Sequence, residues 1–116
     1  MAVNLYDAAY DLEKAIRQSD EYTRLTKMYD AVYADATARK MFEDFRNLQL
    51  KLQEKQMTGQ EITQQEVDQA QQTVGIVQQN LKIAQLMEAE QQMSRVIADL
   101  NQLIMKPLEE LYSSHQ

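Results

Sequence analysis

The chain has 116 residues, a formal net charge of −6 at neutral pH and no cysteine. It contains two glycines and one proline, while the strong helix formers are plentiful, so the sequence predicts an all-α protein. A length of this order corresponds to one domain, and the absence of cysteine excludes disulfides and thiolate metal sites. The negative charge argues against a general nucleic-acid-binding protein, which normally presents a basic face.

Three features of the sequence bear on where the protein works. No apolar run approaches the roughly 18 residues of a membrane span, so we expect no membrane association. The first seven residues carry no basic flank and no long apolar stretch, which is unlike a signal peptide. A reducing compartment suits a chain without cysteine, so the sequence predicts a cytoplasmic protein.

Helix start signals divide the first half of the chain. Asn4, Ser19 and Asp35 are each followed by apolar residues at helical spacing, and their side chains can accept hydrogen bonds from the first turn. They therefore predict three successive helices. Gly59 can adopt the left-handed conformation that ends the third of these helices.

The second half of the chain contains two further start signals. Thr63 and Glu66 form a capping box that opens a fourth helix, and Asn80 caps the fifth and longest. Pro107 lacks an N–H group, so we expect a bend or a restart near Lys106. The fifth helix carries a sustained apolar seam, interrupted only by Glu90 and made of Ile83, Leu86, Met93, Ile97, Leu100, Ile104, Pro107 and Leu111.

The length of this seam predicts self-association. From Leu81 to about Lys106 the helix would extend roughly 40 Å. A compact domain of about 100 residues has a radius of gyration near 13 Å, so part of the seam would remain in water in a monomer. A twofold dimer covers such a strip by presenting the same patch from both chains. The predicted interface consists of Ala89, Met93, Val96, Ile97, Leu100, Leu103 and Ile104.

The predicted architecture is a helical hairpin-like array of about five helices with a long C-terminal helix, forming one domain over residues 1–116. Residues 20–58 resemble residues 65–103, because a short helix, a capped break and a long helix occur twice. The two interpretations are an internal repeat of hairpin-like units and a chance similarity between amphipathic helices.

The sequence shows no assembled catalytic equipment. Its single histidine, His115, is the penultimate residue, and there is no phosphate-binding loop, no Gly-rich dinucleotide turn and no inward-facing Glu-x-x-His pair. We therefore expect no enzyme activity, no metal and no cofactor. Two features stay open. Glu90 either contributes to partner specificity within the seam or lies at the solvent-exposed margin of the seam. The tyrosines of the first third suit either an interface or a partly buried core lining, and they are Tyr6, Tyr10, Tyr22, Tyr29 and Tyr33.

Several of these residues resemble the YlbF/YmcA family, and the YheA branch of it in particular. They are Ser19-Asp20-Glu21-Tyr22, Asp35 with Phe42 and Phe45, Gln49, Gln56 and Gly59, and Asn80 followed by Ala89-Glu90. The resemblance implies a cytoplasmic helical homodimer. It also implies relatives in a multiprotein complex that influences competence, biofilm formation, sporulation and RNase Y-dependent mRNA processing. Those relatives use cysteines for an iron–sulfur cluster, and this chain has none to carry that role.

Three hypotheses follow for the function. The first is a non-enzymatic regulatory or accessory protein that acts through self-association and protein–protein contacts. The second is a purely structural, self-associating helical module. The third is an RNA-binding accessory protein, which would need a local basic patch such as Arg39, Lys40 and Arg46.

Overall fold

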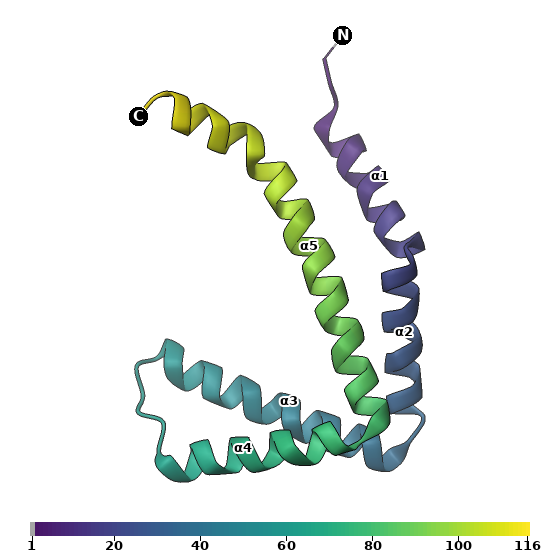
Figure 1. Cartoon of the computed structure of the whole chain (residues 1–116), viewed down its shortest axis with the longest axis vertical. Helices are drawn as coiled ribbons and strands as arrows, with labels where there is room; N and C mark the ends of the chain where they lie inside the picture. The colour runs from purple at the N-terminus through teal and green to yellow at the C-terminus, as the bar shows by residue number, and fades with distance from the viewer. Residues whose placement is uncertain (1) are drawn as a thin grey trace. The chain divides into compact units, whose positions relative to one another are not determined.

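The computed structural model describes residues 2–116, and these residues form five helices and no strand (Figure 1). The helices are α1 (Leu5–Gln18), α2 (Asp20–Tyr33), α3 (Ala36–Met57), α4 (Gln64–Gln79) and α5 (Leu81–Ser114). The all-α prediction and the long C-terminal helix are confirmed.

The helices begin at the predicted capping residues. The Asn4 side chain accepts hydrogen bonds from the backbone N–H groups of Tyr6 and Asp7 at 3.1 Å, and Ser19 Oγ accepts from Tyr22 at 3.2 Å. These bonds satisfy N–H groups of the first turn that have no partner within the helix. The chain can therefore turn between α1 and α2 with a single intervening residue.

The remaining caps follow the same rule. Asp35 accepts from the backbone of Thr37 and Ala38, and Asn80 accepts from that of Ile83 at 3.2 Å. The capping box of Thr63 and Glu66 is present in both directions. Gly59 has φ of +74° just after α3, which is the left-handed conformation predicted for it.

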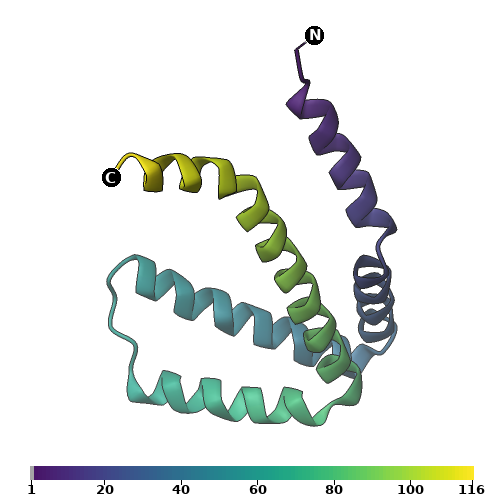
Figure 2. The same ribbon diagram turned by 45° about the horizontal axis from the view of Figure 1, so that its top comes forward.

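The residues group into two compact units, which we describe separately. The first, unit 1, comprises the chain up to Leu25 together with Glu88–Gln116, and the second, unit 2, comprises Thr26–Met87. Helices α2 and α5 each contribute residues to both units. In unit 2, α3 and α4 run antiparallel beside each other and are joined by the turn at Gly59 (Figures 1 and 2).

Unit 2 has a small apolar core with an aromatic cluster on one side. The Phe42 ring meets those of Tyr29 and Tyr33 edge to face, at centroid distances of 5.9 and 6.3 Å. The Arg46 guanidinium lies 4.9 Å above the Phe42 ring and donates a hydrogen bond to Tyr29 Oη at 2.8 Å. The buried apolar residues are Val32, Ala38, Phe42, Phe45, Val77, Ile83 and Leu86.

The repeat hypothesis pairs each residue of 20–58 with the residue 45 positions later, and several buried residues of this core form such pairs. Val32 and Val77 are both buried, as are Ala38 and Ile83, and within each pair the two positions differ by 45. The caps Asp35 and Asn80 differ by the same number. The N-termini of α3 and α5 also interact, because Lys82 Nζ lies 3.1 Å from the Asp35 carboxylate. From α2 to α5 a shorter helix alternates with a longer one, and the internal repeat of hairpin-like units stays a prediction.

An ion pair joins the C-terminal end of α3 to the N-terminal end of α4. Lys55 Nζ lies 2.6 Å from a Glu66 carboxylate oxygen, and the side chains are only 23% and 15% exposed. The hydrogen bond from Lys55, together with the N–H of Thr63, lowers the pKa of Glu66 from 4.5 to about 2. The same carboxylate therefore closes the hairpin and caps α4.

We expect Glu66→Gln to destabilise the protein at neutral pH and to have no effect in strong acid. Because the pKa of Glu66 is lowered on folding, its contribution is complete above about 4.5 and disappears as the pH falls through about 2. Urea unfolding of both proteins at a series of pH values measures this, with Glu61→Gln, an exposed carboxylate in the preceding turn, as the matched control. A Glu66→Gln deficit that is independent of pH would contradict the assignment.

Helix α5 continues through Pro107 to Ser114, so the predicted restart does not occur. The ribbon instead curves along the last third of the helix (Figure 2). This curvature agrees with the predicted bend, because a proline inside a helix removes one hydrogen bond and clashes with the preceding turn.

Candidate functional site

The solvent exposure of the apolar seam of α5 increases towards the C-terminus of the helix. Its N-terminal members Ile83, Leu86 and Met93 are at most 9% exposed in a single chain. From Ile97 onward the apolar side chains are exposed except for the half-buried Leu100, although their helical spacing continues. We call this exposed apolar part of α5 the C-terminal stripe, which consists of Ile97, Leu103, Ile104, Leu108 and Leu111, with exposed fractions from 38% to 63%.

The predicted interface residues fall into three groups. Ala89 and Met93 are already buried within the chain, so they have little surface left for a partner. Val96 and Leu100 are half-buried. The exposed members, Ile97, Leu103 and Ile104, belong to the C-terminal stripe.

The candidate surface extends further towards the C-terminus than the predicted interface. Leu108 and Leu111 are 43% and 52% exposed and continue the helical spacing of Ile97 and Ile104. Leu111 already belonged to the predicted seam, and α5 continues from Ile104 to Ser114.

Helix α1 adds to the apolar surface of unit 1. It contains no buried residue, and its inward side reaches only the half-buried Leu12 and Ile16. Near its N-terminus, Leu5, Tyr6 and Tyr10 are exposed. The exposed Tyr6 and Tyr10 agree with the interface interpretation of the tyrosines, whereas Tyr22 and Tyr29 are half-buried and agree with a partly buried core lining. Glu90 is also half-buried, beside the fully buried Ala89.

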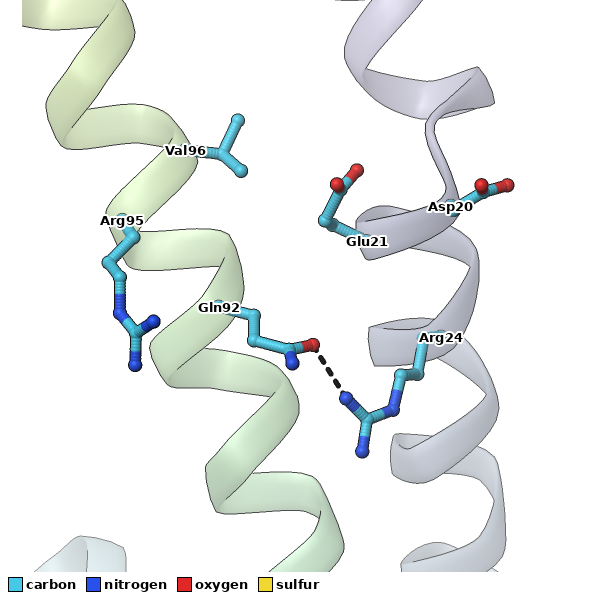
Figure 3. A pocket seen from close by; sticks show the side chains of 6 residues that line it. All are labelled: Asp20, Glu21, Arg24, Gln92, Arg95 and Val96. Carbon is cyan, nitrogen blue, oxygen red and sulfur yellow. Dashed lines mark hydrogen bonds between the residues drawn. The ribbon is translucent and has the colours of Figure 1, made fainter.

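A polar pocket of about 370 Å³ lies between the start of α2 and the middle of α5 in unit 1 (Figure 3). Arg24 reaches across from α2 and donates a hydrogen bond to Gln92 Oε1 at 2.6 Å, and it lies 3.7 Å from Glu88. The remaining lining residues are Asp20, Glu21, Arg95 and Val96. With two carboxylates, two guanidinium groups and no nucleophile, the pocket resembles a hydrated helix contact more than a reaction site.

The carboxylates with shifted pKa values have structural roles. The pKa of Asp35 is lowered mainly by the backbone N–H of Ala38 and then by Lys82, and Glu66 is held by Lys55. Both groups cap helices. Within residues 2–116 there is no cluster of three or more His, Cys, Asp or Glu side chains that could hold a metal ion. His115 lies in the exposed C-terminal turn.

No helix in the described part of the chain is long and apolar enough to cross a membrane. The residues of that part form a helical protein in which α5 and α1 carry exposed apolar side chains. The chain belongs to the YlbF/YmcA family, because the family model described as "Control of competence regulator ComK, YlbF/YmcA" matches residues 5–109.

The relatives confirm the resemblance to the YheA branch. The chain is 66% identical over 114 residues to UPF0342 protein YheA of Bacillus subtilis, covering 98% of this chain and 97% of that protein. It is 66% identical over 116 residues to a UPF0342 protein of Bacillus velezensis, with both chains covered completely.

Solved structures show the same fold. A protein of unknown function (DUF964) from Bacillus stearothermophilus has a TM-score of 0.89 at 47% identity, covering 97% of this chain and 98% of that one. Bacillus subtilis RicA, solved in complex with RicF, has a TM-score of 0.68 at 18% identity over 97% of this chain and 99% of its own. At that identity the likeness to RicA concerns the fold alone.

Proposed function

We propose that this protein is a non-enzymatic, cytoplasmic regulatory or accessory protein that acts by helix-to-helix association. Its first partner is a second copy of itself, and the dimer then contacts other proteins. The observation that carries this proposal is the C-terminal stripe, in which a regular apolar seam continues for several turns beyond the part that the chain itself covers. Monomeric proteins seldom leave contiguous apolar surface of this kind in water.

The family supports a regulatory role. Its description concerns control of a competence regulator, and the distant structural relative RicA was solved in complex with RicF. The names of the relatives include no enzymatic activity. An interaction surface without an assembled reaction site agrees with this pattern.

The structure disfavours the RNA-binding alternative. Arg39 and Lys40 on α3 pair with Glu43 and Asp44 at 3.9 and 3.1 Å, and Arg46 is engaged by the aromatic cluster. The basic residues that would form an RNA-binding patch are therefore balanced locally by acids or held within unit 2. A phosphate backbone would have to displace these contacts to bind.

Sedimentation of the purified wild-type protein at tens of micromolar tests the proposal, and we expect a dimer. A tagged wild type should also retain from its native cytoplasm a protein that a variant with a charged C-terminal stripe does not retain. A dimer without any such partner would favour the purely structural module. A monomer at these concentrations would contradict self-association itself.

A further inference from the structure

Helices α1 and α5 run antiparallel in unit 1 (Figures 1 and 2), and one contact shows which residues on the two sides lie at the same level. This contact is the hydrogen bond that Arg24, at the start of α2, donates to Gln92 on α5. In an antiparallel arrangement, the residue four positions before Arg24 lies level with the residue four positions after Gln92. These residues are Asp20 and Val96, and both line the polar pocket, which agrees with this register (Figure 3).

The same register, continued past Ser19, matches the apolar side of α1 to that of α5. Three apolar residues of α1 are separated by seven and four positions, and the residues level with them on α5 are apolar as well. Such separations place residues on one side of a helix. The matched pairs are Ile16 with Leu100, Leu12 with Ile104, and Leu5 with Leu111. The two apolar sides therefore correspond over the whole length of α1.

Burial decreases along these pairs with distance from Ser19. Ile16, Leu12 and Leu100 are half-buried. At the other end of the match, Leu5 is 73% exposed and Leu111 is 52% exposed. The ribbons of α1 and α5 also diverge towards these ends (Figure 1). Two apolar sides that match in register are thus covered only where the helices are close to the turn at Ser19.

A single residue between α1 and α2 can redirect α1. Ser19 has extended backbone angles, with φ of −71° and ψ of 154°. Its N–H and its Oγ both donate to the Ile16 carbonyl, at 3.1 and 2.6 Å, and its Oγ accepts from the N–H of Tyr22. The bonds that end α1 and begin α2 thus meet at Ser19, so a change in its angles moves α1 while both helices stay formed. Because α1 contains no buried residue, little apolar contact opposes this movement.

We propose that α1 is a strap that closes on the C-terminal stripe of its own chain in this register, and that a partner displaces the strap to reach the stripe. This inference rests on the proposed use of the stripe as an association surface, because the strap controls access to that surface. Closure removes the exposed ends of both apolar sides from water in one step. The opposite side of α1 carries Asp7, Asp11 and Lys14, so the closed strap presents a polar exterior.

Pairs of cysteines test the closure in a chain that has none of its own. With a short bifunctional maleimide in dilute solution, we expect Leu12→Cys combined with Ile104→Cys to give a product linked within one chain, identified by its intact mass. Lys14→Cys combined with Ile104→Cys is the matched control, because Lys14 lies on the polar side of α1, and this pair should link at least about tenfold more slowly. Links only between chains, or equal rates for the two pairs, would overturn the closure.

Release of the strap provides a second test. A strap that is closed most of the time hides the stripe from a second copy, so we expect Leu5→Asp with Leu12→Asp to lower the dissociation constant of the dimer by about tenfold. The prediction holds even if these changes unfold α1, since the stripe is then uncovered as well. Lys14→Asp changes the net charge by the same amount on the polar side and should leave the constant unchanged. A release variant that associates no more tightly than the wild type would overturn the strap.

Sedimentation of the same samples separates this inference from the proposed function. Chains that link within themselves but stay monomeric at tens of micromolar, in the wild type and in the release variant, would support the closure and overturn self-association. A dimer whose dissociation constant does not respond to release of α1 would overturn the strap and leave self-association in place.

Discussion

Replacing Leu103 and Ile104 together with aspartate is expected to convert the dimer into a folded monomer. Both side chains belong to the C-terminal stripe and are 63% and 61% exposed in a single chain, so the substitutions leave the fold of one chain intact. In the dimer each would bury a carboxylate without a partner, which typically costs several kcal/mol. We expect the dissociation constant to rise by about 100-fold or more.

The two positions are chosen from the predicted interface residues because both are exposed in a single chain. Val96 is a predicted interface residue, but it is half-buried and lines the polar pocket with Arg24 and Gln92. Aspartate at Val96 would disturb unit 1 itself. Ile104 has no such role in the described structure.

The matched control is Leu50→Asp with Met57→Asp on α3. These side chains are 61% and 81% exposed, so the control adds the same charge at apolar positions of comparable exposure outside the stripe. Sedimentation equilibrium and far-UV circular dichroism should show a dimer of normal helix content. If the Leu103/Ile104 variant stayed dimeric, or if the control dissociated equally, the interface would lie elsewhere.

The helix boundaries could be predicted because capping is a local interaction. Ser19, Asp35 and Asn80 each bond to a backbone N–H no more than three residues ahead, so residue type and position are enough to place the helix start. The stop at Gly59 is local as well, since only the conformation of that residue is involved.

The division of the α5 seam could not be predicted in the same way. Ile83 and Ile104 are chemically identical positions of one helical pattern, yet the first has no exposed surface and the second is 61% exposed. The difference depends on which elements lie beside each turn in three dimensions. Helical periodicity records that a face is apolar, but not whether the same chain or another one covers it.

The aromatic cluster of unit 2 could not be predicted from the helical spacing of apolar residues either. In the sequence Phe42 is one apolar position of the third predicted helix and one of the residues that resemble the YlbF/YmcA family. Its contacts with Tyr29, Tyr33 and Arg46 connect α2 to α3 across the capped break at Asp35. Such contacts depend on the angle between two helices, which the sequence does not state.

We expect Phe42→Ala to cause the largest loss of stability among single substitutions in unit 2. The side chain is 2% exposed, and truncating a buried phenylalanine typically costs about 3 to 5 kcal/mol. The substitution also removes the ring beneath Arg46 and both edge-to-face contacts, each of which adds roughly 0.5 to 1.5 kcal/mol beyond burial. These costs overlap, so we expect a total near the upper end of that range.

The control for this prediction lies on the same helix. Leu50→Ala truncates an apolar side chain of α3 that is 61% exposed, and it should change the free energy of unfolding by less than about 0.5 kcal/mol. Because association contributes to apparent stability, all variants should be unfolded in urea at one protein concentration. Phe42→Leu, which retains most of the apolar volume, should recover much of the loss. A Phe42→Ala deficit no larger than that of Leu50→Ala would show that the aromatic cluster does not hold α2 against α3.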